Sequence, residues 1–275
     1  MIDQWLSSYP SSPLHKLYAQ VNVVEIVDPS ESVKDYLGKE LVDSYRQLDF
    51  LKFHYESLPE ADLRNYLKTY TLPPDHNQIT KNVRQGDFGE VLAHLIVSFF
   101  ENRAVPLKKM RWKFNAGRSV FSTDMLAHNH GPAITDLYYY EIKSRLNIKK
   151  ESINGLNAFV TIHAHNSLLK DANQPNEGIA DFLSRYYFEK EDFAQATKYH
   201  DIVNNPTKYN KSYELFFIIE TPKYIDDILD DLEALPPGLI PLRVTIVLIK
   251  NLGRLIVEVQ NRAIEQAVDY VYLKP

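Results

Sequence analysis

The chain has 275 residues, a formal net charge of −5 and no cysteine. Its length allows one large domain, or one domain with a smaller companion region. The lack of cysteine excludes disulfide bonds, thiolate metal sites and cysteine nucleophiles, and the acidic balance taken alone argues against a nucleic-acid partner.

The sequence shows neither a membrane-spanning run nor the pattern of a signal peptide. No apolar run approaches the roughly 20 residues that a membrane-spanning helix needs. The first residues do not place an apolar run after a basic one, as a signal peptide does. We therefore expect a cytoplasmic protein with no membrane partner.

The first 80 residues are predicted to form a partly helical N-terminal region, with a main domain over residues 81–275. Val21–Val27 is a candidate short strand. The acids that follow Pro59 are typical of a helix start, because they oppose the helix dipole. Pro73 and Pro74 then end that unit.

Asn82–Arg103 is predicted to be a long helix. Its wide apolar face comprises Phe88, Val91, Leu92, Leu95, Ile96 and Phe99. Gly86 and Gly89 weaken a helix interior. We expect them to mark a close approach of another backbone.

Three extended segments are expected next: Met110–Phe114, Ser122–Ala127 and Leu137–Lys143. A turn at Asn129–Pro132 suggests that the last two form a hairpin-like pair. In the first segment, Arg111 and Lys113 would share one face of the strand.

The rest of the chain indicates a mixed α/β fold. Ser152–Leu169 is predicted to be one helix, and residues 177–203 two more. Ser212–Glu220 and Pro241–Lys250 are apolar, β-branched runs typical of buried strands, and Tyr224–Leu232 is a crossover helix candidate between them. Helices and strands in this order predict a mixed sheet flanked by helices.

Charge is uneven along the chain. Residues 1–80 hold 7 basic and 12 acidic residues, residues 81–150 hold 12 and 6, and residues 151–275 hold 12 and 18. A segment of net charge +6 thus lies between flanks of −5 and −6. Such asymmetry points to a polyanion site, although blocks of this size also vary by chance.

Chemistry is most plausible at the end of the third extended segment. Glu141 and Lys143 would point to the same face of the strand. A carboxylate there can bind a hard divalent cation, and an ammonium can orient a water. The Glu141–Lys143 pair alone is weak evidence for a functional site, because Glu-x-Lys is common on solvent-exposed strands. Asp124 and Glu90 strengthen it, since Asp124 stands in an otherwise apolar segment and Glu90 at the edge of the helix's buried face.

This set resembles the PD-(D/E)XK nuclease superfamily, which has the restriction-endonuclease-like fold. The resemblance implies that Glu90, Asp124 and Glu141 ligate Mg²⁺ or Mn²⁺. It also implies that Lys143 positions the attacking water. The family's proline is missing, because Ser122 and Thr123 stand before Asp124.

A closer resemblance covers three strings, Gln85–Glu90, Ser122–Leu126 and Tyr139–Arg145. They look like the HamA-type nuclease subunit of the Hachiman anti-phage system. That resemblance implies a DNA nuclease working with a helicase subunit of the HamB type. This chain has no phosphate-binding loop of the GxxxxGK[ST] kind, so an ATP-driven motor would be another chain.

Several basic residues near these strings are candidate nucleic-acid contacts: Arg111, Lys113, Arg145, Lys149 and Lys150. Such residues neutralise backbone phosphates. A solvated strand surface is the competing interpretation for any one of them.

Two functions therefore stand side by side. The first is a metal-dependent DNA nuclease. The second is a non-cleaving subunit that binds DNA or a protein and keeps the four polar positions as an ion-pair cluster. In either case the acidic flanks would bind a protein partner, or screen the basic segment until activation.

Overall fold

The computed structural model describes residues 1–11, 17–113, 123–173, 178–235 and 238–273. Its centre is a seven-stranded mixed sheet with the order β1-β2-β9-β8-β5-β4-β3. The strands are β1 (Leu6–Pro10), β2 (Ala19–Glu25), β3 (Arg103–Ala104), β4 (Met125–Asn129), β5 (Asp136–Arg145), β8 (Asn210–Glu220) and β9 (Leu242–Ile249). A separate hairpin consists of β6 (Glu151–Ile153) and β7 (Leu156–Ala158).

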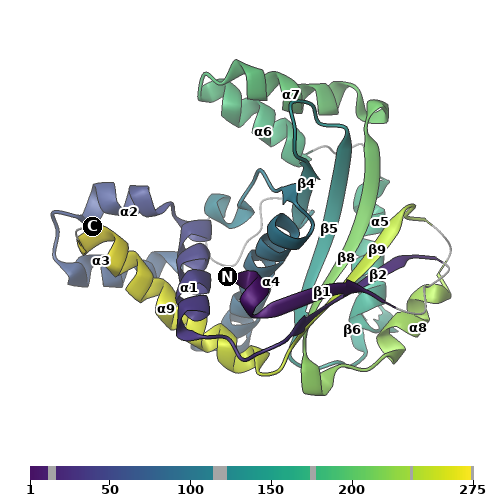
Figure 1. The fold of residues 1–275 in the computed structure, drawn as a ribbon, viewed down its shortest axis with the longest axis horizontal. Helices are drawn as coiled ribbons and strands as arrows, with labels where there is room; N and C mark the ends of the chain where they lie inside the picture. The colour runs from purple at the N-terminus through teal and green to yellow at the C-terminus, as the bar shows by residue number, and fades with distance from the viewer. Residues whose placement is uncertain (12–16, 114–122, 174–177, 236–237, 274–275) are drawn as a thin grey trace.

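Helices cover both faces of the sheet (Figure 1). They are α1 (Glu31–Tyr45), α2 (Leu48–Tyr55), α3 (Glu60–Tyr66), α4 (Gln78–Phe100), α5 (Val160–Ala172), α6 (Gly178–Glu189), α7 (Phe193–Asn204), α8 (Asp227–Glu233) and α9 (Leu252–Tyr272). Helices α1, α4 and α9 bury one apolar face of the sheet, and α5 and α8 bury the other. Helices α6 and α7 stand together beyond the ends of β4 and β5.

The middle of the sheet is buried on both sides. Leu215–Ile219 of β8 has no measurable exposure, because alternate residues pack on the two core clusters. Strand β8 pairs in parallel with both β5 and β9, whereas β4 pairs antiparallel with β5. The predicted mixed sheet flanked by helices is confirmed, as is the hairpin-like pair.

The first 80 residues contribute to the same sheet. Strand β2 pairs in parallel with β9, and β1 pairs antiparallel with β2. Helix α1 packs along α9, where a Cβ on Gly38 would lie 2.8 Å from the Cβ of Arg262. The sheet therefore takes strands from both sides of the boundary drawn at residue 80.

Two sequence predictions are wrong in part. Met110–Phe114 is not a strand where it is described, because Lys109–Trp112 forms a short 3-10 helix, η3. Arg111 and Lys113 therefore do not share a strand face. The predicted helix over Ser152–Leu169 begins only at Val160, since β6 and β7 take up the residues before it.

Other elements match their predictions closely. Helix α4, the pair α6 and α7, the crossover helix α8 and the two apolar strands β8 and β9 are all present. The long C-terminal helix α9 was not anticipated. None of the helices in the described ranges is both long and apolar enough to cross a membrane.

Candidate functional site

Asp124, Glu141 and Lys143 meet where β4 begins to pair with β5. Asp124 immediately precedes β4, and the register that pairs Met125 with Tyr140 sets it beside Glu141. Its Oδ2 accepts a hydrogen bond from the backbone N–H of Ile142 at 2.8 Å. The carboxylate thus continues the hydrogen-bond ladder by one step and is fixed at the edge of the sheet. Asp124 was predicted within the strand and in fact stands at its start.

Glu141 and Lys143 lie on the same face of β5, as their spacing predicted. Lys143 Nζ donates to Glu141 Oε1 at 2.5 Å and lies 3.9 Å from Asp124 Oδ2. Glu141 is only 3% exposed, and its Oε2 is buried without a hydrogen bond of ordinary geometry. A buried, unsatisfied carboxylate oxygen is costly, so this atom is a natural ligand position for a cation.

Glu90 reaches the same region from helix α4. The helix can approach β5 because residue 89 is glycine: a Cβ there would lie 2.9 Å from the Cβ of Ser144. A close approach is therefore present at Gly89, but the approaching atoms belong to the side chains of Ser144 and Ile218 and not to another backbone, as was expected. At Gly86 no atom lies within 4 Å of such a Cβ, so that part of the expectation is wrong.

Lys109 connects the carboxylates. It stands at the first position of η3, and its Nζ is 2.8 Å from Asp124 Oδ1 and 3.5 Å from Glu90 Oε1. Lys109 is not among the residues predicted for the site, and no sequence pattern distinguishes it from the adjacent Lys108. Only the fold shows that one is buried in the site while the other pairs with Glu40 and Asp43.

Burial and charge move the pKa values of the acids in opposite directions. Burial raises the pKa of both Glu90 and Glu141 to about 7, and the charge of Asp124 adds to this effect. Burial also acts to raise the pKa of Asp124, but Lys109 and Lys143 outweigh it and lower that pKa. The cluster therefore contains one carboxylate that is firmly ionised and two that protonate near neutral pH.

The lysines of the cluster stay charged. Burial alone would lower the pKa of Lys143, but the charges of Asp124 and Glu141 outweigh it, and the pKa is raised. The same balance, with Glu90 and Asp124 as partners, raises the pKa of Lys109. Both side chains therefore act as ammonium groups and hydrogen-bond donors rather than as bases.

The donor set fits a hard divalent cation, which prefers carboxylate oxygens. Within the described ranges, no three Asp, Glu or His side chains stand close enough together to hold an ion as they are. An ammonium instead lies between Asp124 and Glu90 as a cation would. The carboxylates therefore match the chemistry of a divalent cation, and the ammonium of Lys109 lies between two of them.

The predicted nucleic-acid contacts have different surroundings. Arg111 binds the side chain of Asp43 at 3.1 Å, and Arg145 binds that of Glu151 at 2.9 Å. Lys113 is half-buried and donates to Asp87, which also accepts a hydrogen bond from the hydroxyl of Tyr45. The remaining two, Lys149 and Lys150, are exposed.

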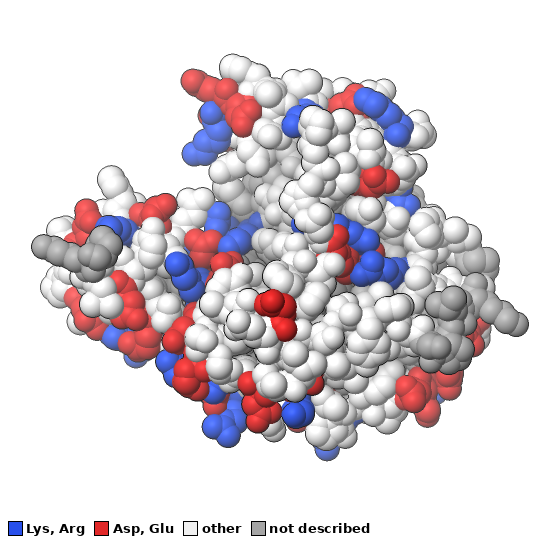
Figure 2. Space-filling model, viewed as in Figure 1, with Lys and Arg blue, Asp and Glu red and all other residues white. Residues whose placement is uncertain are grey.

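Two concavities adjoin each other at the site. A small cavity of about 20 Å³ is lined by Glu90, Lys109 and Asp124 among others. An open groove of about 630 Å³ runs on from it toward α1 and shares His94, Val105 and Lys108 with it. In Figure 2 the outline is indented between the α6–α7 pair and the α1–α3 group, and basic and acidic side chains are mixed there.

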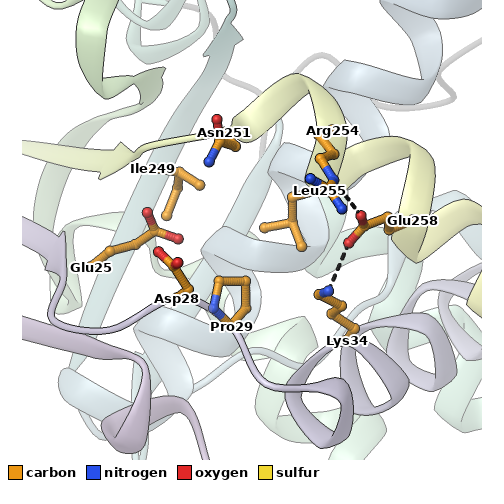
Figure 3. Close-up of a pocket in the computed structure, with 9 residues that line it drawn as sticks. All are labelled: Glu25, Asp28, Pro29, Lys34, Ile249, Asn251, Arg254, Leu255 and Glu258. Atoms are coloured by element: carbon orange, nitrogen blue, oxygen red, sulfur yellow. Dashed lines mark hydrogen bonds and ion pairs between the residues drawn. The ribbon is translucent and has the colours of Figure 1, made fainter.

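A third concavity, of about 180 Å³, lies where β2 and β9 end and α9 begins (Figure 3). None of the candidate site residues lines it. Its basic residues are already paired, since Glu258 binds Lys34 at 2.9 Å and Arg254 at 2.6 Å. It offers no comparable cluster of carboxylates facing a cation.

Comparison with known proteins gives one family. The sequence model of the HamA family matches residues 3–263, which is nearly the whole chain. No curated protein matches the sequence.

Proposed function

This chain belongs to the HamA family, and we propose on that premise that it is a metal-dependent nuclease that hydrolyses phosphodiester bonds in DNA. The family gives it a defence-related role, because HamA is a component of the Hachiman anti-phage system. The observation that carries the proposal is the convergence of Asp124, Glu141 and Lys143 at one sheet edge, with Glu90 opposite.

Mg²⁺ or Mn²⁺ would be held by Asp124 and Glu141, with Glu90 adding a direct or water-mediated contact. The bound ion would lower the pKa of a water and stabilise negative charge at the scissile phosphate. Asp124 is suited to this part because its pKa is lowered and its Oδ2 is already fixed by the N–H of Ile142. Glu141 offers its buried, unsatisfied Oε2.

Lys143 would orient the attacking water and stabilise charge that develops on the phosphate. Its ammonium is held by Glu141 at 2.5 Å, and its raised pKa keeps it protonated at neutral pH. A permanently charged donor beside the carboxylates serves positioning and electrostatic stabilisation, and it leaves proton removal to another group.

A helicase subunit of the HamB type is proposed as the partner. The sequence contains no nucleotide-binding loop that would let this chain drive a motor by itself. The superfamily assignment to PD-(D/E)XK nucleases belongs to the same proposal and is supported by the spacing and convergence of the four residues.

The test is cleavage by purified protein with Mg²⁺, alone and with the co-encoded helicase, on plasmid, linear duplex and single-stranded DNA and RNA. We expect Glu141→Ala and Lys143→Ala each to reduce cleavage by about 10²-fold or more. The control is Glu56→Gln, whose side chain is exposed on the end of α2.

Cleavage that both alanine variants retain in full would overturn the nuclease assignment. If the wild-type protein cuts none of the substrates with its partner present, the second interpretation, a non-cleaving binding subunit, replaces it. Thermal unfolding of each variant shows that a lost activity is not simply a lost fold.

A further inference from the structure

Lys109 is a buried cation surrounded by candidate metal ligands. Its side chain is 6% exposed, and its ammonium donates to Asp124 at 2.8 Å while facing Glu90 at 3.5 Å. It also contacts the backbone carbonyl of Thr123 at 3.5 Å. All of these partners are oxygens, which is the environment that a hard metal ion requires.

The ammonium and a metal ion cannot both occupy this position. The cavity beside Glu90, Lys109 and Asp124 has room for about 20 Å³, roughly one water. Two cations so close together would also repel each other strongly in a buried site. A divalent ion can therefore bind Asp124 and Glu90 only after the ammonium has left.

We propose that Lys109 is a tethered cation on the Glu90 side of the metal site, and that it competes with the divalent ion for Asp124 and Glu90, two of the three proposed ligands. The inference rests on the proposed function, because it assumes that these carboxylates bind metal. Lys109 is then a positioning residue: it keeps the ligands together and neutralised while no metal is bound, and it sets how much metal the site needs.

The surroundings allow this exchange. Lysine carries its charge on a flexible four-carbon chain, so the ammonium can move without the backbone. The open groove of about 630 Å³ begins at Lys108 and His94, next to the small cavity, and provides space for the displaced ammonium. The backbone of η3 stays in place meanwhile, because Arg111 donates to both the backbone carbonyl and the carboxylate of Asp43 on α1, at 2.7 and 3.1 Å.

The experiment measures Mn²⁺ binding to the full chain at pH 8 by titration calorimetry and by the loss of the free-ion spin-resonance signal. Four proteins are compared: wild type, Lys109→Met, Lys109→Gln and the control Lys108→Met. Lys108 is the matched control because it is the neighbouring lysine and pairs with Glu40 and Asp43 instead.

We expect both Lys109 variants to bind Mn²⁺ at least about tenfold more tightly than wild type, because a competing charge has been removed. Lys108→Met should match wild type. Without metal, the Lys109 variants should melt at a lower temperature, since Asp124 and Glu90 lose their partner. Added Mn²⁺ should raise their melting temperature more than it raises that of wild type.

Unchanged or weaker Mn²⁺ binding by both Lys109 variants, with wild type still binding, would overturn the inference and leave the proposed function intact. Absence of binding in all four proteins would overturn the proposed metal dependence itself. If Lys109→Met does not fold, Lys109→Gln decides, because its amide still donates a hydrogen bond to Asp124 without a charge.

Discussion

Each charged side chain of the site depends on its neighbours. Two carboxylates, Glu90 and Glu141, have raised pKa values because they are buried, while Asp124 stays ionised between two ammonium groups. One turn before Glu90 on α4, Asp87 is satisfied by Lys113 and Tyr45. Acids and lysines thus alternate through the cluster, which keeps the net charge small in a region with little water.

The raised pKa of Glu141 predicts how stability depends on pH. Its ordinary value is near 4.5 and its value in the fold is about 7, so the folded chain binds more protons than the unfolded chain between these limits. The unfolding free energy of wild type should therefore fall, relative to Glu141→Gln, as the pH rises from about 4.5 to 7. The relative loss should be on the order of 1–3 kcal/mol.

Chemical denaturation of both proteins in the presence of a chelator, at several pH values from 4.5 to 8, checks this. The chelator matters because a bound metal would favour the ionised form and hide the effect. Two curves that run parallel across the window would show that Glu141 does not titrate there in the folded protein.

The approach of helix α4 to strand β5 decides where Glu90 stands. Gly89 faces Ser144 so closely that a methyl group would lie 2.9 Å from its Cβ, whereas Gly86, one turn earlier, faces open space. The two glycines lie on the same helix, but the structure explains only one of them. One provides a contact, and the other costs helix stability without any contact to justify it.

Alanine at the two positions should therefore have opposite effects. Gly89→Ala should destabilise the fold by about 1–3 kcal/mol, because α4 must move away from β5. Gly86→Ala should stabilise it by about 1 kcal/mol, because alanine favours the helix. Urea unfolding of both variants measures the difference. Equal effects would contradict the packing described here.

Glu90 adds a functional readout to the same pair of variants. If α4 shifts in Gly89→Ala, Mn²⁺ affinity should fall, because Glu90 moves away from Asp124. Gly86→Ala should leave Mn²⁺ affinity as it is in wild type.

At the scale of the whole molecule, the acidic flanks neutralise part of the basic segment. Lys108 and Arg111, from the segment of net charge +6, bind Asp43 of α1. Farther along the sheet, Arg103 of the same segment binds Glu214 of β8 at 2.6 Å. The net charge of −5 therefore hides an internal pairing between parts of the chain that are distant in sequence.

This pairing predicts that Asp43 weakens nucleic-acid binding. Asp43→Asn should leave Lys108 paired with Glu40 alone and Arg111 without a carboxylate partner. It should therefore raise affinity for duplex DNA roughly two- to tenfold at low salt, with a steeper dependence on salt. Asp35→Asn is the control, because it removes the same charge from α1 but pairs with Arg262 of α9. Fluorescence anisotropy at several salt concentrations makes the comparison.

An equal gain in DNA affinity in both variants would mean that net charge alone is responsible. No gain in either variant would mean that Lys108 and Arg111 do not contact DNA. The idea that the acidic flanks screen the basic segment would fail in both cases.

The sequence by itself determined the local features. Alternation along β5 set Glu141 and Lys143 on one face, and unbroken apolar runs identified β8 and β9, because these patterns depend on neighbours in the chain. The helical face of α4 and the pair α6–α7 follow from the same local periodicity. The set Glu90, Asp124, Glu141 and Lys143 also came from spacing and resemblance, and in the fold these residues are connected through Lys109 and Lys143.

Only the tertiary structure decided which basic side chains lie beside the carboxylates of the site. Lys108 and Lys109 are chemically identical neighbours, and the turn of η3 sends one to α1 and the other into the carboxylates. Arg111 and Lys113 likewise found acidic partners from α1 and α4, which no local pattern encodes. A sequence shows which charges exist, but burial and long-range contacts decide which of them meet.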